Sequence, residues 1–171
     1  DAEEVLLYEP GVTVKKVEVV DPQNVKATVE VAPDCRLGQH MAQVRTRSGI
    51  SDYRSFFVGA LPGVDEKEPN NGFDAPQAID MNVCVTGTLQ NEDADYYRVH
   101  VAKGQRISVE VEGIRLGQAY FDPFISVMNK NRFELAAVDD TALARQDGFF
   151  SVVAPEDGDY TILVSESSYR G

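Results

Sequence analysis

The sequence has few of the residues on which zinc sites and catalytic sites depend. Two cysteines, Cys35 and Cys84, stand outside any CxxC or Cys/His spacing, which argues against a structural zinc site. A hydrolytic triad needs a base, and the two histidines, His40 and His100, fall within strand patterns in different parts of the chain. GxSxG, HExxH and phosphate-binding glycine loops are absent, and no pair of acids stands out as a glycosidase pair. The sequence therefore predicts a chain that is not an enzyme.

Crosslinks and membrane segments are also scarce. A disulfide between Cys35 and Cys84 would have to join two domains, so we expect two buried, unpaired thiols. His100 stands on the polar side of its strand pattern and is expected at the surface. No apolar run approaches the length of about 18 residues that a membrane helix needs, and no stretch of these residues has the pattern of a signal peptide. The chain lacks an initiator Met and ends at Tyr169–Gly171 soon after a strand pattern, so we expect a fragment of a longer, exported protein.

Acidic residues outnumber basic residues, chiefly in the second part of the chain. Residues 1–60 carry seven Lys or Arg against nine Asp or Glu, a net charge of −2. Residues 61–171 carry nine against nineteen, a net charge of −10. This acidity argues against nucleic acid and anionic membranes as partners. The excess carboxylates form either a solvated surface or, in part, a set of cation ligands.

The first sixty residues consist of short β-forming runs between turn residues, with no helical period. Val12–Val19 alternates with period two and shifts phase at Lys15-Lys16, which predicts a bulge or a bend. Val25–Val31 alternates throughout, so one face of this strand should be buried. Further strands are expected at Met41–Thr46 and Ser55–Val58. Strands at a spacing of about ten residues indicate an antiparallel sandwich.

A series of motifs in this part follows a known order. The series is Leu6 to Gly11, Val25 to Val31, Ala32-Pro33-Asp34, Leu37 to His40 and Val44 to Gly49. It resembles the later strands of IPT/TIG-type immunoglobulin-like modules, whose opening Pro- and Gly-rich strand has no counterpart here. The resemblance implies an incomplete immunoglobulin-like module over residues 1–60.

A joint begins at Ala60–Val64, and a second all-β pattern follows it. The visible strand patterns are Val83–Leu89, Tyr96–Val101, Arg106–Val111, Phe121–Met128, Phe133–Val138, Phe149–Val153 and Tyr160–Val164. Lys103-Gly104-Gln105 has turn composition and predicts a hairpin between the strands on either side of it. Alternation of this kind again predicts a β-sandwich.

Eight motifs recur in order across this second part. They are Glu66 with Glu68 to Asn71, Ala75 with Ala78-Ile79, Val85 with Gly87 and Leu89, Asp93 with Asp95 to Tyr97 and Val99, Lys103-Gly104-Gln105, Phe121-Asp122-Pro123, Asp139-Asp140, and Glu156-Asp157-Gly158 with Tyr160. The series resembles the bacterial pre-peptidase C-terminal domain, a family related to the collagen-binding modules of collagenases. The resemblance implies a jelly-roll-like β-sandwich over residues 65–171 that is itself not catalytic.

The acidic segment Asp65–Asp74 concentrates four carboxylates and two amides in ten residues. Irregular chain of this composition can supply the oxygen ligands that Ca²⁺ requires. Glu66 and Glu68 are two residues apart and point the same way in an extended segment, which Pro69 favours at Glu68. Composition alone leaves a solvated linker as the alternative.

The pre-peptidase resemblance implies a fuller ligand set, because in the collagen-binding relatives the acidic linker supplies Ca²⁺ ligands and pairs with a later turn. Carried over to this sequence, the ligands are Glu66, Glu68, Asn70, Asn71, Asp93 and Asp95, with Glu92 as a substitute. Asp122, Asp139 and Asp140 are expected to end strands by side-chain bonding, with a second cation or a ligand contact as the alternative. Collagen binding would require exposed aromatic residues, for which the candidates are Tyr96, Tyr120, Phe121 and Tyr169.

Together these observations predict two all-β sandwich domains from a secreted, periplasmic or cell-surface bacterial protein. The function we expect is that of an accessory or adhesion module, stabilised by Ca²⁺, whose partners are other domains of the parent chain and extracellular protein or polysaccharide. The alternative is a purely structural spacer within a larger secreted enzyme such as a peptidase.

Overall fold

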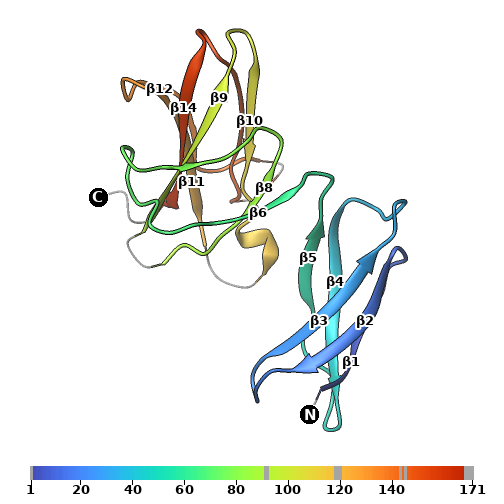
Figure 1. The fold of residues 1–171 in the computed structure, drawn as a ribbon. Helices are drawn as coiled ribbons and strands as arrows, with labels where there is room; N and C mark the ends of the chain where they lie inside the picture. The colour runs from blue at the N-terminus through green and yellow to red at the C-terminus, as the bar shows by residue number, and fades with distance from the viewer. Residues whose placement is uncertain (1, 91–92, 118–120, 143, 145, 168–171) are drawn as a thin grey trace. The chain divides into compact units, whose positions relative to one another are not determined.

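We describe the protein from a computed structural model, in which residues 2–90, 93–117, 121–142, 144 and 146–167 are described. These residues form fourteen β-strands and one short 3-10 helix, which confirms the predicted all-β fold (Figure 1). The chain divides into two compact units, residues 1–60 with 116–118 and residues 61–115 with 119–171. No helix within the described ranges is long and apolar enough to cross a membrane.

The first unit consists of two small antiparallel sheets. One has the strand order β1-β4-β5, formed by Ala2–Leu7, Gly38–Thr46 and Arg54–Val58. The other joins β2 (Val12–Val19) to β3 (Val25–Val31). The register between β2 and β3 shifts between Val14 and Lys16, which confirms the bulge predicted from the phase shift in β2.

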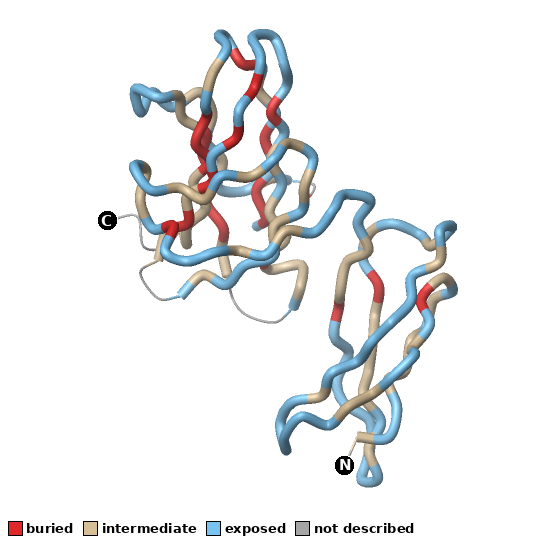
Figure 2. The backbone as a smooth tube through the Cα atoms, in the orientation of Figure 1, coloured by how far each residue is buried: buried red, intermediate tan, exposed pale blue. Residues whose placement is uncertain are grey.

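Few side chains of the first unit are buried (Figure 2). Among its described residues Val12 is the one buried apolar side chain, and His40 and Ser55 are the buried polar ones. Val29 and Val31 belong to the alternating face of β3 that was expected to be covered, yet they are 41% and 46% exposed. The alternation therefore predicted the strand correctly and its burial wrongly.

The second unit contains three sheets. A five-stranded sheet has the order β12-β11-β14-β9-β7, formed by Glu134–Val138, Pro123–Asn129, Gly158–Glu166, Ala94–Val101 and Gln77–Ala78. A two-stranded sheet pairs β10 (Arg106–Glu110) with β13 (Phe149–Val153). The third pairs β6 (Gly63–Asp65) with β8 (Cys84–Thr86) in parallel. The 3-10 helix spans Ile114–Leu116.

One hydrophobic core lies between the five-stranded sheet and the β10-β13 sheet, as expected for a β-sandwich. Its fully buried members include Ile125 and Val127 from β11, Tyr160 from β14 and Ile107 from β10. Period-two alternation explains this core, because every second residue of β9, from Tyr97 to Val101, points into it.

The prediction of a hairpin around Lys103-Gly104-Gln105 is wrong. β9 pairs with β14 and β7, and β10 pairs with β13, so the turn carries the chain from one sheet to the other. Local turn composition identifies a reversal of the chain but not the sheet to which each strand belongs.

Both cysteines are free thiols, in agreement with the expectation that they are unpaired. The expectation that they are buried is wrong, because Cys84 is exposed and Cys35 is only partly covered. Cys84 lies on the short strand β8, one side of which is open to solvent.

Candidate metal centre

The acidic segment that follows β6 lies along the second unit and is attached to it by the backbone. Glu66 N–H donates to Thr86 C=O at 2.9 Å, and Lys67 N–H donates to Gln77 Oε1 at 2.8 Å. Farther along, the Asn70 carbonyl accepts from Tyr96 N–H at 2.9 Å. These hydrogen bonds hold the segment against β8 and β9, so it forms an edge of the folded domain.

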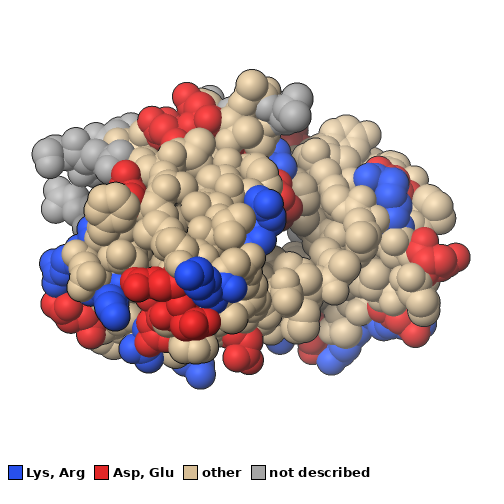
Figure 3. Space-filling model, turned by 90° about the horizontal axis from the view of Figure 1, so that it is seen from above, with Lys and Arg blue, Asp and Glu red and all other residues tan. Residues whose placement is uncertain are grey.

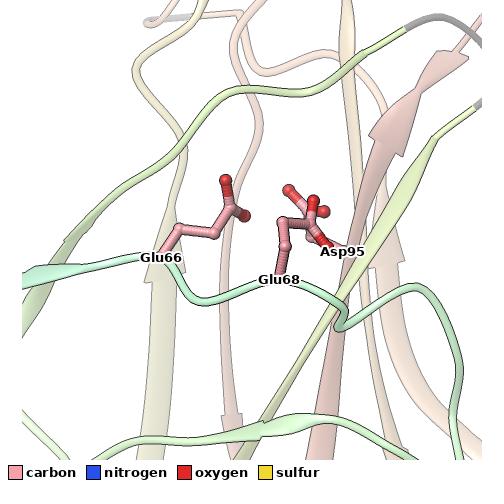
Figure 4. Close-up of side chains that lie close together, drawn as sticks. All are labelled: Glu66, Glu68 and Asp95. Carbon is pink, nitrogen blue, oxygen red and sulfur yellow. The ribbon is translucent and has the colours of Figure 1, made fainter.

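Three carboxylates converge where this segment meets β9. Oxygens of Glu66, Glu68 and Asp95 all lie within 4.8 Å of one another. Figure 4 shows the side chains of Glu66 and Glu68 projecting from the same segment toward the side chain of Asp95. The two-residue spacing places Glu66 and Glu68 on one side of extended chain, and the first position of β9 after Ala94 supplies Asp95.

Burial distinguishes this group from the other acids of the chain. On the face drawn in Figure 3, acidic side chains gather in several small surface groups with Lys and Arg between them. Asp95, in contrast, is 2% exposed, while Glu66 is half-buried and Glu68 is exposed at the mouth of the group. An ionised carboxylate at such a depth needs hydrogen bonds or a cation to replace its lost hydration.

Asn70 lies among the three carboxylates and is fully buried. With its amide turned so that the nitrogen faces them, Asn70 donates to Asp95 Oδ1 at 3.3 Å and to Glu68 Oε2 at 2.9 Å. With the amide turned the other way, the side-chain oxygen of Asn70 faces the carboxylates, which are themselves hydrogen-bond acceptors. The first orientation suits a site without a cation, and the second suits a site with one.

Glu66 is held in place by donors from β8 and β9. Its Oε2 accepts from Thr88 N–H at 2.8 Å, and its Oε1 accepts from the Tyr97 hydroxyl at 2.5 Å. The carboxylate also rests against Gly87, where an added Cβ would lie 2.6 Å from Glu66 Oε2. Gly87 therefore provides the space in which this carboxylate lies.

The pKa values of Asp95 and Glu66 are shifted in opposite directions. Burial, followed by the hydrogen bond and charge of Glu66 and the charges of Asp93 and Glu68, raises the pKa of Asp95 to about 8. Burial also raises the pKa of Glu66, but its hydrogen bonds from Tyr97, Thr88, Asp95 and Asn70 outweigh that effect and leave the pKa lowered. Without a cation, the site therefore favours the protonated form of Asp95 beside an ionised Glu66.

The remaining predicted ligands form a separate contact beside this group. The Asn71 side-chain amide donates to Asp93 Oδ1, which also accepts from Ala94 N–H at 2.9 Å. Asp93 is close enough for its charge to raise the pKa of Asp95. Of the six predicted ligands, the structure thus brings four together and pairs the other two next to them. Glu92, the predicted substitute, lies outside the described residues.

Tyr97 is a member of this site that the sequence prediction treated only as core. Its ring is buried, and its hydroxyl reaches Glu66 and, at 3.5 Å, Asp95 Oδ2. A signal was present, because Tyr97 stands two residues after Asp95 on the same face of β9, and a buried tyrosine hydroxyl needs a polar partner.

A second buried acid, Asp147, has its partners within the protein. It is fully buried and accepts from the backbone N–H groups of Gly113 at 3.0 Å and Ile114 at 2.8 Å, and from Arg115 Nε at 2.5 Å. Asp147 therefore fixes the 3-10 helix and the chain before it. The sequence prediction did not single it out.

Asp122, Asp139 and Asp140 lie near one end of the five-stranded sheet. Burial, followed by the charges of Asp139, Asp140 and other acids, raises the pKa of Asp122. Within the described residues, Glu66, Glu68 and Asp95 are the one group of three or more acids, histidines or cysteines with metal-ligand spacing, so these aspartates do not form a second one.

Neither histidine has the setting of a triad. His100 is on the surface, as expected, and its Nδ1 lies 2.7 Å from Asp159 Oδ1. His40 is buried, and Cys35 Sγ lies 3.9 Å from its Nε2, a proximity that the sequence did not reveal. The same nitrogen lies 2.7 Å from the Arg36 carbonyl, to which it must donate, so it cannot accept a proton from the thiol.

The aromatic candidates for collagen binding do not form an exposed group in the described part of the chain. Tyr96 and Phe121 are half-buried, and the Phe121 ring packs over Gly113. Tyr120 and Tyr169 lie outside the described residues.

Comparison with known families bears on the second unit. Residues 93–166 match the family model of the bacterial pre-peptidase C-terminal domain. This part of the chain is therefore similar to that domain. The match spans β9 to β14, including Asp93 and Asp95, whereas Glu66 to Asn71 precede it. No curated protein matches the chain.

Pre-peptidase C-terminal domains are accessory domains of secreted bacterial peptidases. The expectation of such a domain, drawn from the motif series, is therefore confirmed for the matched residues. The match does not reach the first unit, whose resemblance to IPT/TIG modules stays a prediction, as does the relation to collagen-binding modules.

Proposed function

We propose that the chain is a non-catalytic accessory or adhesion module of a secreted or cell-surface bacterial protein, and that Ca²⁺ stabilises its pre-peptidase C-terminal domain. The observation that carries the proposal is the convergence of Glu66, Glu68 and Asp95, one of them almost fully buried.

The residues present fit a calcium ion. Ca²⁺ binds oxygens at about 2.3–2.6 Å, so two oxygens on one ion lie at most about 5 Å apart. The three carboxylates meet this limit, since their oxygens lie within 4.8 Å of one another. All the available donors are oxygens, which favours Ca²⁺ over the metals that prefer nitrogen or sulfur. Asn70 would add its amide oxygen, and Asn71 and Asp93 are the nearest further ligands.

The role of such an ion would be structural. Glu66, Glu68 and Asn70 belong to the segment after β6, and Asp95 belongs to β9, so a shared cation would tie the N-terminal edge of the domain to its central sheet. The ion would also supply the positive charge that this group of acids lacks. No basic side chain is hydrogen-bonded to Glu66, Glu68 or Asp95 in the described residues.

Calorimetric titration of the chelated protein with Ca²⁺ tests this proposal. We expect saturable binding with a dissociation constant of roughly 10⁻⁴–10⁻³ M, as in extracellular modules, and a higher melting temperature when Ca²⁺ is bound. Glu68→Gln and Asp95→Asn should weaken the binding, whereas Glu134→Gln, an exposed acid on β12, should not. Absence of both heat and a melting shift would remove the metal from the proposal.

The accessory role has a rival, a purely structural spacer in a larger secreted enzyme. Both readings agree with an accessory, non-catalytic domain. Arrays of glycans and extracellular matrix proteins distinguish them, because an adhesion module should bind some member saturably and a spacer should bind none.

A further inference from the structure

The strand β3 in the first unit has an open edge. Among the described strands it pairs with β2 alone, so one of its two edges faces no other strand. An open edge presents a row of backbone N–H and C=O groups that can pair with another chain.

Two hydrogen bonds at the ends of the β2-β3 pair identify the residues on that edge. Val20 N–H donates to Asn24 C=O at 2.9 Å, and Ala32 N–H donates to Gly11 C=O at 2.7 Å. The bulge lies in β2, so β3 alternates without interruption between these points. The even-numbered residues of β3 thus direct their backbone groups to β2. The odd-numbered residues, Val25, Ala27, Val29 and Val31, direct theirs to the open edge.

The side chains of β3 divide in the same way. Val25, Ala27, Val29 and Val31 share one face, and Val29 and Val31 are 41% and 46% exposed on it. Lys26, Thr28 and Glu30 share the opposite, exposed face. The strand therefore combines an open edge with a row of apolar side chains, of which Ala27, Val29 and Val31 are exposed.

We propose that this edge binds a second copy of the chain, β3 against β3, in an antiparallel arrangement centred on Thr28. In this register Val25 lies opposite Val31 of the other copy, and Ala27 lies opposite Val29. Residues whose backbone groups face the edge thus meet one another, as an antiparallel ladder requires. The two β2-β3 pairs become one four-stranded sheet with a continuous apolar face.

Charge complementarity selects this partner and this register. Centred on Thr28, the pairing places Lys26 of each copy opposite Glu30 of the other, which gives two opposite-charge pairs across a twofold axis. A shift by two residues in either direction removes both charge pairs and shortens the overlap. The first unit also carries a net charge of only −2 of the total of −12, so association through it brings together the less charged parts of two acidic chains.

Sedimentation equilibrium of the chain tests the proposal over about 10 μM to 1 mM, the range in which small interfaces associate. We expect a monomer–dimer equilibrium. Lys26→Glu or Glu30→Lys alone places like charges opposite each other twice and should weaken dimerisation about tenfold or more. A mixture of the two single variants should recover it as a heterodimer, because both opposed pairs then have opposite charges again. The proposal is overturned if the chain is a monomer throughout the range, or if neither charge reversal changes the affinity of dimerisation.

A backbone substitution gives a second test that does not depend on charge. Ala27→Pro removes an N–H that faces the open edge and leaves the bonds to β2 intact, so the unit should fold but lose the dimer. Thr28→Pro instead removes a hydrogen bond to β2, so it should lower the melting temperature of the first unit. It serves as the destabilised control for Ala27→Pro. If Ala27→Pro folds and still forms the dimer, the contact lies on another surface, and the proposal is wrong.

Discussion

The two units of this chain are built from similar strands but differ in what those strands bury. In the second unit, side chains from β9, β10, β11, β13 and β14 form one core with Ile125 and Val127 fully covered. In the described residues of the first unit, Val12 alone is a buried apolar side chain. Alternation of apolar and polar residues is thus sufficient to form a strand, whereas a core needs a second layer that covers the apolar face.

Polar residues sharpen this contrast. In the second unit Asp147 is fully buried and is matched by several donors from one short segment. In the first unit His40 is buried, but its partner Glu9 is 35% exposed and also bonds the exposed Arg36. Stability should therefore respond strongly to changes in the second unit and weakly to matched changes in the first.

The largest effect is expected from Asp147→Ala. The substitution removes the acceptor of three backbone N–H groups and of Arg115 Nε, at a cost of about 3 kcal/mol or more in the free energy of unfolding. Glu9→Gln is the matched change in the first unit and should cost less than about 1 kcal/mol, because that carboxylate remains accessible to water. Differential scanning calorimetry measures both, and equal losses would contradict the comparison.

A pair of valines tests the same contrast in apolar packing. Val127→Ala in β11 removes buried methyl groups from a site that is 0% exposed and should cost about 2–3 kcal/mol. Val19→Ala in β2 makes the same chemical change at a side chain that is 48% exposed and should cost less than about 1 kcal/mol. Urea unfolding followed by circular dichroism provides the two values. A larger loss for Val19→Ala would show that the first unit has a core that its exposures do not reveal.

The strands could be predicted from the sequence because period-two alternation is a local property. β3 and β13 coincide with their predicted ranges, and the bulge in β2 was visible as a change of phase. The pairing of β9 with β14 and of β10 with β13 could not be predicted, because these partners are far apart in the sequence and no local signal links them. The exposure of β3 could not be predicted for the same reason.

The candidate site was predictable where its residues are close in sequence. Glu66 and Glu68 point the same way because they are two residues apart, and the motif series indicated that Asp95 would face them. Tyr97 and Gly87 were missed, because their roles depend on where the Glu66 carboxylate lies in space. The separate pairing of Asn71 with Asp93 likewise follows from the fold and not from residue type.

The pH dependence of stability should also differ between the two units, because the second unit contains the buried carboxyl group of Asp95. Asp95 has a pKa of about 8 in the folded protein, against about 4 for an ordinary aspartate, so between these values the folded state holds the extra proton. Stability of the second unit without metal should therefore fall as the pH rises from about 4 to about 8. We expect the melting temperature in EDTA to fall over this window, because the folded state gives up the proton that stabilises its buried carboxyl group.

Two controls accompany that measurement. Saturating Ca²⁺ favours the ionised carboxylate and should abolish the fall. Asp95→Asn, which lacks the titrating group, should flatten the profile in EDTA. A wild-type profile that is equally flat in EDTA would show that Asp95 ionises without cost, contrary to its burial.

The smallest effect on stability, and the most selective effect on the site, is expected from Gly87→Ala. The added Cβ would lie 2.6 Å from Glu66 Oε2, and the flexible end of the glutamate can turn aside, so the free energy of unfolding should change by less than about 1 kcal/mol. The turned carboxylate loses its bond from Thr88 N–H and leaves the group that faces Asp95, so the affinity for Ca²⁺ should fall about tenfold. Gly63→Ala is the matched control, since nothing lies within 4 Å of its added Cβ. Calorimetric titration of both variants distinguishes the outcomes, because an equal affinity for Ca²⁺ in the two would mean that Glu66 does not bind the ion.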